Sequence, residues 1–203
     1  MTDTAAPLAI PLPGADLLCW PGRDWQTAAG GELLARLQAE IPWRQEQITL
    51  FGKTHLQPRL ICWMGDPGCR YTYSGKQWEP QGWHPLVATL KQEVEQLTGG
   101  RFNSVLLNLY RDGRDGMGFH ADDEPELGPR PVIASLSLGA ERVMHFRHRR
   151  DRTIPTFRLP LEDGSLLLMR GDTQRNWKHA IPKRQSPTGL RLNLTFRMIR
   201  VGL

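Results

Sequence analysis

Two stretches in the first half of the chain carry apolar residues at helical spacing. In residues 25–41 the leucines and an isoleucine fall on one stripe, and the stretch ends before Pro42. In residues 84–98 leucines and valines recur every three or four positions, a proline stands in the first turn, and Gly99 follows the last of them. Apolar residues at this spacing share one helix face, while Pro and Gly mark helix starts and ends. The pattern therefore predicts two amphipathic helices.

Most of the remaining chain alternates short β-rich runs with turn residues. Runs rich in Val, Ile, Leu, Phe and Trp are separated by Gly, Pro and Asp, and these runs are most frequent after residue 100. Many short strands with regular turn signals are typical of an antiparallel sandwich or barrel. The predicted strands are 47–51, 58–63, 71–73, 103–110, 132–138, 142–147, 154–159, 165–169, 177–181 and 190–199.

The last of these strands has two chemically different faces. Side chains alternate between the two faces of a strand, so residues two apart lie on the same side. One face carries leucines and a phenylalanine for the core. The other carries polar side chains and is expected to line a cavity; these are Arg191, Asn193, Thr195 and Arg197.

Length and composition favour a single globular domain. The chain has 203 residues, 39% of them hydrophobic, with 7 Trp and 20 Gly. That length supports one buried core. We expect residues 1–42 to form an N-terminal arm and helix, with 1–20 lying over the surface, 43–80 to form a lid and 100–203 the β core.

Targeting signals and cysteine patterns indicate an ordinary reducing compartment. The N-terminal stretch lacks a basic region and its apolar run is broken by prolines, so we expect no signal peptide. No apolar run approaches the roughly 20 residues of a membrane span. The three cysteines match no zinc spacing and receive no role. A cytoplasmic protein, monomeric by default and without a membrane partner, is the expectation.

Positive charge is concentrated in the second half of the chain. Residues 1–100 contain 8 basic and 10 acidic side chains, whereas residues 101–203 contain 18 basic and 11 acidic ones. Such an excess fits a surface that faces a polyanion, although arginine-rich turns also occur on ordinary solvated faces. The densest part of the cluster contains Arg142, Arg147, Arg149, Arg150 and Arg152, beside His145 and His148.

Two histidines and a carboxylate suggest a metal centre. His120 and Asp122 are two residues apart, so on an extended segment both side chains point the same way. His179 stands 59 residues later, where another strand can bring it opposite. A 2-His-1-carboxylate set with open positions is typical of non-haem Fe(II) oxygenases. A surface histidine in a turn is the alternative for the His-x-Asp pair alone.

The arginines that follow His179 suit a dianionic co-substrate. A 2-oxoacid can fill two open iron positions and O₂ the third. The distal carboxylate of 2-oxoglutarate then needs a cation, and a planar guanidinium provides a bidentate contact. Arg191 and Arg197 both fall on the polar face of the last strand. Alternatively, these arginines lie on a strand edge that faces solvent.

At these residues the chain resembles the AlkB family of Fe(II)/2-oxoglutarate-dependent nucleic-acid demethylases, from about Leu50 to Ile199. The motifs that carry the resemblance are Asn108-Leu-Tyr110, His120-Ala-Asp122-Asp123-Glu124, Ile133-Ala-Ser-Leu-Ser-Leu-Gly139, Phe146-Arg-His148, residues 161–169, His179 and Arg191-Leu-Asn-Leu-Thr-Phe-Arg197. The resemblance implies a mainly β (α+β) fold, a double-stranded β-helix or jelly roll with flanking N-terminal helices. It also implies that His120, Asp122 and His179 hold iron and that 2-oxoglutarate is held by Asn108, Tyr110, Arg191, Asn193, Thr195 and Arg197. Arg191 would meet the distal carboxylate and Arg197 would lie nearer the iron.

The segment 43–80 contains candidates for nucleotide recognition. Phe51, Gly52 and Lys53 follow an extended run like a hairpin tip, which suits an aromatic wedge between bases with a lysine on phosphate. The alternative is a turn whose phenylalanine folds back into the core. The tip is similar to the intercalating finger of the duplex-DNA-repairing animal members of the family. The residues Arg59, Tyr71, Thr72 and Tyr73 also follow as in those members.

Residues beside the metal ligands complete the predicted substrate site. An enzyme that acts on a base in a duplex must flip it out and hold it between aromatic surfaces, here Tyr71, Tyr73 and His120. The carboxylate of Asp123, with Glu124 after it, would pair with a cationic methylated base. A solvated acidic turn is the plain alternative for these two residues.

These observations predict DNA repair by oxidative demethylation. The expected enzyme uses Fe(II), O₂ and 2-oxoglutarate on 1-methyladenine or 3-methylcytosine in duplex or single-stranded DNA and releases formaldehyde, succinate and CO₂. An RNA demethylase and a protein or small-molecule hydroxylase share the same core and stay open. An idle nucleic-acid-binding module and a zinc-dependent cupin-like enzyme are weaker alternatives.

Overall fold

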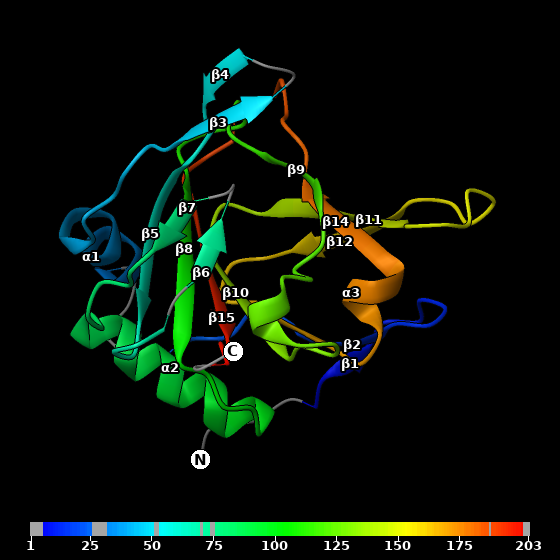
Figure 1. Cartoon of the computed structure of the whole chain (residues 1–203), viewed down its shortest axis with the longest axis horizontal. Coiled ribbons are helices and arrows are strands. Elements are labelled where there is room, and N and C mark those ends of the chain that lie inside the picture. The colour runs from blue at the N-terminus through cyan, green and yellow to red at the C-terminus, as the bar shows by residue number, and fades with distance from the viewer. Residues whose placement is uncertain are drawn as a thin grey trace.

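Two β-sheets that lie face to face form the body of the protein (Figure 1). A computed structural model of the chain describes residues 6–25, 32–50, 53–69, 71–73, 76–186 and 188–200. One sheet has seven strands and the other has four. A buried apolar cluster, including Tyr110, Phe146 and Trp177, lies between them.

The larger sheet runs in the order β1-β2-β13-β10-β15-β8-β5, with every neighbouring pair antiparallel. Apart from β1 and β2, neighbouring strands of this sheet are not consecutive in the sequence, so long connections leave the sheet and return. The bounds are β1 Leu8–Ala9, β2 Asp16–Trp20, β5 Leu60–Gly65, β8 Ser104–Tyr110, β10 Ile133–Gly139, β13 Leu166–Arg170 and β15 Arg191–Arg197.

The smaller sheet runs in the order β12-β11-β14-β9. From β8 to β15 the chain passes repeatedly between the two sheets: β8, β10, β13 and β15 belong to the larger sheet and β9, β11, β12 and β14 to the smaller. This winding is the double-stranded β-helix, so the predicted jelly-roll core is confirmed. The smaller sheet contains β9 Met117–His120, β11 Arg142–His148, β12 Phe157–Leu161 and β14 Trp177–Ile181.

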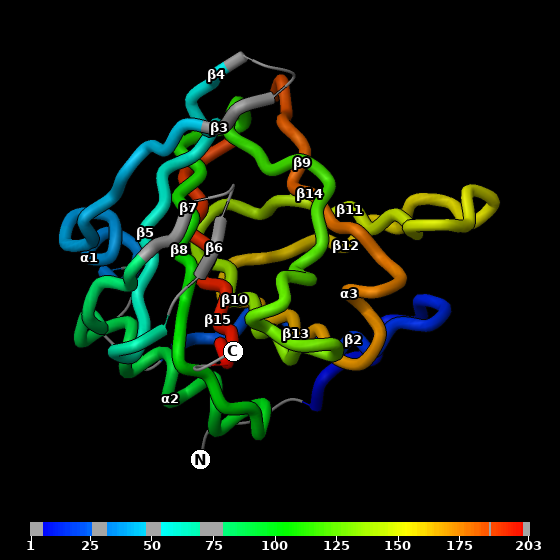
Figure 2. Tube along the Cα trace, in the orientation of Figure 1, coloured from blue at the N-terminus to red at the C-terminus, as the bar shows by residue number. Residues whose placement is uncertain are grey.

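Two helices cover the outer face of the larger sheet, as the tube in Figure 2 traces. They are α1 (Glu32–Glu40) and α2 (Pro85–Thr98), and their apolar faces pack on outward side chains of β8, β10, β13 and β15. Pro85 stands in the first turn of α2, and Gly99 ends the helix at φ +69 with its N–H bonded to the carbonyl of Glu95. Two shorter helical segments, η1 (Pro125–Leu127) and α3 (Thr173–Asn176), precede β10 and β14.

Two small hairpins and one core strand make up the segment predicted to be the lid. The hairpins pair β3 (Gln47–Leu50) with β4 (Lys53–Leu56), and β6 (Tyr71–Tyr73) with β7 (Lys76–Trp78). Between them, β5 joins the larger sheet beside β8. The β3–β4 hairpin extends beyond the sheets at the top of Figure 1. This segment therefore combines part of the core sheet with hairpins outside it.

The N-terminal segment contributes more to the core than its composition indicates. Residues 16–20, which the sequence analysis assigns to a surface arm, form β2 between β1 and β13. Leu17 and Trp20 of this strand are buried. Prolines at 11 and 13 dominate the local pattern, but they precede the strand and leave its backbone free to pair with β13.

Candidate active site

A cavity of about 410 Å³, measured with its opening to solvent, lies between the two sheets. Strand β15 presents its alternate side chains to it, while its leucines and Phe196 face the helices on the other side. The neighbouring strand β8 adds two polar residues. These six polar lining residues are Asn108, Tyr110, Arg191, Asn193, Thr195 and Arg197.

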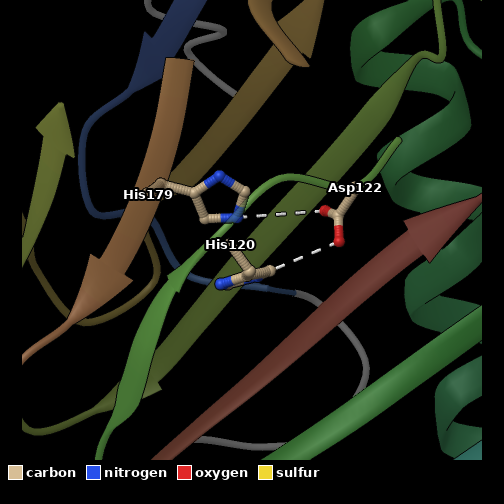
Figure 3. A group of neighbouring side chains, drawn as sticks. All are labelled: His120, Asp122 and His179. Carbon is tan, nitrogen blue, oxygen red and sulfur yellow. Dashed lines mark ion pairs between the residues drawn. The ribbon is translucent and has the colours of Figure 1, made fainter. Parts of the chain in front are cut away.

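The predicted metal ligands lie together, as Figure 3 shows, and all three line this cavity. His120 ends β9, Asp122 follows two residues later, and β14 places His179 directly opposite His120 in the strand pairing. Each histidine Nε2 lies 3.9 Å from a different carboxylate oxygen of Asp122. The possible ligand atoms of the three residues all lie within 4.8 Å of one another. One ion can therefore contact all three.

The two histidines have the protonation that metal binding requires. Nδ1 of His120 lies 3.0 Å from the carbonyl oxygen of Gly118, which can only accept, so Nδ1 carries the proton and Nε2 keeps its lone pair. Burial lowers the pKa of His120 and, together with the charge of His120, lowers that of His179 to about 3. Both imidazoles are neutral at neutral pH.

Asp122 is ionised although it is buried. Burial by itself would raise the pKa of this carboxyl, but the charge of Arg197, joined in acid by the charge of the two histidines once they are protonated, lowers it to about 2. Arg197 Nη2 also donates a hydrogen bond of 2.8 Å to Oδ1. The site thus holds one carboxylate and two neutral imidazoles.

One oxygen of this carboxylate is left for a ligand. Oδ2 of Asp122 is buried and has no hydrogen-bond partner among the described residues. A buried acceptor without a partner is costly, and a cation between Asp122 and the histidines would satisfy it. Two imidazole nitrogens and one carboxylate oxygen match the donor set of Fe(II) oxygenases. The residues present fit an iron ion.

Arg191 offers buried hydrogen-bond donors at the other end of the cavity. Its Nη2 donates to Ser137 Oγ at 2.9 Å, while Nε and Nη1 are buried and have no hydrogen-bond partner in the described part of the chain. Burial lowers the pKa of this guanidinium to about 10, so it stays charged at neutral pH. It also lies over the ring of Tyr110, 5.2 Å from its centre. A carboxylate is the natural partner for such a group.

A hydrogen-bonded ladder fixes the polar face between these two ends. Asn193 Nδ2 donates to Ser135 Oγ at 2.8 Å, and the Thr195 hydroxyl donates to the side-chain oxygen Oδ1 of Asn193 at 2.9 Å. Ser135 and Ser137 on β10 were not among the predicted site residues. The alternation of β10, where leucines and serines take turns, is the signal that could have identified them.

Arg59, predicted to bind substrate, lies inside the protein. It is 4% exposed, and its Nε donates to Asn108 Oδ1 at 2.8 Å. Asn108 is one of the residues predicted to hold 2-oxoglutarate. The structure thus places Arg59 in the protein interior, hydrogen-bonded to a residue that lines the cavity.

The two acidic residues after Asp122 do not line the cavity. Asp123 is exposed, and its Oδ2 accepts a hydrogen bond from Arg149 at the start of the β11–β12 loop. Glu124 immediately precedes η1. In this arrangement the charge of Asp123 is matched by an arginine from the predicted basic cluster.

The predicted lid residues are described only in part. Phe51 and Gly52 lie outside the described residues. Lys53 begins β4 and Tyr71–Tyr73 form β6, but only their backbone is described. The structure therefore gives the strands that hold Lys53, Tyr71, Thr72 and Tyr73 and leaves their side chains as predictions.

Comparison with known proteins agrees with this geometry. A model of the 2OG-Fe(II) oxygenase superfamily matches residues 17–197. The human alpha-ketoglutarate-dependent dioxygenase alkB homolog 3 is 42% identical over 175 residues, 82% of this chain and 60% of its own length. The human DNA oxidative demethylase ALKBH2 is 40% identical over 181 residues, 85% of this chain and 69% of its own length.

The solved structure of OsALKBH1 has the same fold, with a TM-score of 0.60 and 18% sequence identity, and the match covers 95% of this chain and all of that one. The chain spans about 60% of the length of the alkB homolog 3 proteins. Within the described residues, no helix is long and apolar enough to cross a membrane. The matched family model, the two sets of relatives and the iron-binding triad together establish that the chain belongs to the 2OG-Fe(II) oxygenase superfamily and, within it, to the AlkB family.

Proposed function

We propose that the protein repairs alkylated DNA by oxidative demethylation, removing methyl groups from 1-methyladenine and 3-methylcytosine. The observation that supports this most is the cavity itself. The triad lies at one end of the cavity and Arg191 at the other, with the polar face of β15 between them. This arrangement suits a metal ion at the triad and a dianion that lies between the metal and Arg191. One relative, ALKBH2, is named a DNA oxidative demethylase, which supports DNA as the substrate.

The residues of the chain have separable roles in this proposal. His120, Asp122 and His179 hold Fe(II), and Arg197 keeps the Asp122 carboxylate ionised and oriented. Arg191 binds the distal carboxylate of 2-oxoglutarate, helped by Tyr110 and the polar face of β15. With these groups bound, the site supplies the oxidation of a substrate C–H bond by O₂.

The overall reaction balances in atoms and electrons. One oxygen atom of O₂ enters the N-methyl group and the other enters succinate, as 2-oxoglutarate loses CO₂ and provides two electrons. The N-hydroxymethyl group then loses its C–N bond to give formaldehyde and the repaired base. The apolar wall of the cavity, which includes Leu106 and Ile181, limits water around the reacting methyl group.

Recognition of the base is assigned to the two hairpins and to Asp123. Phe51 at the β3–β4 tip would wedge between bases, Lys53 would contact phosphate, and Tyr71 and Tyr73 would hold the flipped base. Arg149 donates to Oδ2 of Asp123, so a cationic base would share this carboxylate with the arginine and meet it at the other oxygen.

The decisive experiment is formaldehyde release by the iron-loaded protein. We would supply 2-oxoglutarate, ascorbate and DNA that carries a single 1-methyladenine, in matched duplex and single-stranded forms. The proposal expects formaldehyde and succinate in equal amounts, with no product from the His179→Ala variant. Absence of formaldehyde from both DNA forms would contradict it.

The same assay separates the alternatives. Release from methylated RNA but not DNA would indicate an RNA demethylase. Succinate formation that no nucleic acid stimulates would favour a protein or small-molecule hydroxylase. Equal rates for the parent and a Phe51→Ala variant, on both duplex and single-stranded DNA, would remove the wedge from the proposal while leaving the chemistry in place.

A further inference from the structure

Gln174 is a buried polar residue next to the metal ligands. It lies on α3, just before β14, and is 2% exposed. Its side-chain Oε1 accepts a hydrogen bond of 3.0 Å from the backbone N–H of Asp122. Its Nε2 donates to the sulfur of Met169 at 3.4 Å. Both ends of the carboxamide are therefore engaged, one of them with the main chain of a metal ligand.

The main chain around Asp122 has little other support from secondary structure. Strand β9 ends at His120, and residues 121–124 belong to neither helix nor strand. A metal ligand on such a segment needs fixed backbone to keep its carboxylate in place. The hydrogen bond from the Asp122 N–H to Gln174 fixes the backbone at the metal ligand itself.

The helix that carries Gln174 is itself anchored to the larger sheet. The Thr173 hydroxyl donates to the carbonyl of Arg170 at 2.6 Å and accepts from the backbone N–H of Asp16 at 2.9 Å. These contacts tie α3 to the ends of β13 and β2. Gln174 thus links the segment that carries Asp122 to a rigid part of the fold.

Arg149 contacts both Gln174 and the segment that carries Asp122. Its Nη1 donates to the main-chain oxygen of Gln174 at 3.0 Å and also to Asp123 Oδ2. One guanidinium therefore bridges Gln174 and the residue that follows Asp122. The start of the β11–β12 loop is connected to the metal site through two hydrogen bonds.

We propose that Gln174 is a positioning residue for the metal, which holds the Asp122 main chain so that its carboxylate faces both histidines, with Arg149 as its support. This deepens the proposed function and depends on it only for the presence of a metal ion. Partners of metal ligands typically change metal affinity by 10- to 100-fold when they are removed. Gln174 does not line the cavity and acts through the main chain of Asp122, so its effect is expected in metal affinity.

The test compares two substitutions of nearly equal volume in the full chain. Gln174→Met removes the acceptor for the Asp122 N–H and keeps an unbranched side chain, whereas Gln174→Glu keeps the acceptor oxygen. Mn(II) binding to the metal-free protein is measured by titration, with thermal unfolding recorded separately. We expect about a 10-fold weaker Mn(II) affinity for Gln174→Met and an affinity within about threefold of the parent for Gln174→Glu. Equal affinities of Gln174→Met and the parent would overturn the proposal, as would a Gln174→Glu affinity as weak as that of Gln174→Met.

A second pair of variants covers the case in which Gln174→Met does not fold. Arg149→Met removes the support of Gln174, whereas Arg152→Met removes a charge from an exposed position on the same loop. We expect about threefold weaker Mn(II) binding for the first and the parent affinity for the second. Identical affinities in both variants would contradict the role of Gln174. None of these titrations needs DNA, so failure of demethylation with normal Mn(II) binding would concern the proposed function alone.

Discussion

Arg197 on β15 and Asp122 after β9 form a buried ion pair, with Nη2 and Oδ1 2.8 Å apart. The two side chains are 7% and 4% exposed. This contact joins the polar face of the larger sheet to the segment after β9 that carries the metal ligand Asp122. It is also the main reason that the pKa of Asp122 falls to about 2 despite burial.

Replacing Arg197 by methionine should weaken metal binding and make it depend on pH. Without the guanidinium, burial raises the pKa of Asp122, so a proton competes with the metal. Loss of one partner from a buried pair also costs about 3–5 kcal/mol of unfolding free energy. Titrations with Mn(II) at several pH values, with Arg197→Lys as the charge-preserving control, test this. A pH-independent affinity in Arg197→Met would show that another group keeps Asp122 ionised.

The metal-free protein should lose stability as the pH falls below about 6.5. In the unfolded chain His179 takes up a proton near its ordinary pKa of 6.5, whereas in the folded protein it does so only near 3. The unfolded state therefore binds more protons between these values, and stability present above pH 6.5 is lost as the pH falls toward 3. His120 acts in the same direction. Asp122 adds a loss between 3.8 and about 2.

Urea unfolding at about pH 8 and about pH 5.5 measures this effect, since a group that titrates only in the unfolded state changes the unfolding free energy by up to about 1.4 kcal/mol per pH unit. The His179→Gln variant provides the control, because it keeps a polar side chain of similar size without the titration. Its unfolding free energy should fall less over the same range. A parallel decrease in both proteins would assign the effect to other groups.

Arg191→Lys should raise the KM for 2-oxoglutarate by about 10-fold or more, since a lysine cannot reproduce the fork of a guanidinium. Metal affinity should stay near that of the parent, because Arg191 lies at the other end of the cavity from the triad. Succinate formation as a function of 2-oxoglutarate concentration measures the first quantity and Mn(II) titration the second. Unchanged KM with lowered metal affinity would place the dianion elsewhere.

Arg142→Met should destabilise the fold and leave nucleic-acid binding unchanged. The guanidinium is 1% exposed and donates to the main-chain oxygens of Asp112, Asp115 and Pro182. Leaving buried carbonyls without donors costs about 3 kcal/mol in total. Urea unfolding tests the loss, and the salt dependence of binding to unmodified DNA is the control. A smaller salt slope would mean that Arg142 contacts phosphate after all.

Much of the fold followed from local patterns along the chain. The limits of α2 were predictable because Pro85 and Gly99 act within one turn of their own positions. The polar face of β15 was predictable because side-chain alternation is a property of any strand. Strand β2 was not predicted, because its pairing with β13, about 150 residues away in the sequence, leaves no pattern in its own five residues.

The basic cluster is a case in which the local sequence pattern did not predict where the side chains lie. Sequence alone grouped Arg142, Arg147 and Arg149 as one charged surface. In the structure Arg142 points inward and is buried, Arg147 lies over the ring of Phe119 at 4.0 Å, and Arg149 joins Asp123 to Gln174. Each of these outcomes depends on a partner from a different strand or loop.

The sequence by itself determined the ligand types, their shared strand faces and the family, because residue identity and period-two alternation are local. Only the tertiary structure decided that Arg59 is buried and donates to Asn108, and that Gln174 accepts a hydrogen bond from the main chain of Asp122. It also decided that Arg197 reaches Asp122 across the two sheets. These contacts join residues 49 to 75 positions apart, and no local pattern encodes which buried polar groups will meet when the sheets close on each other.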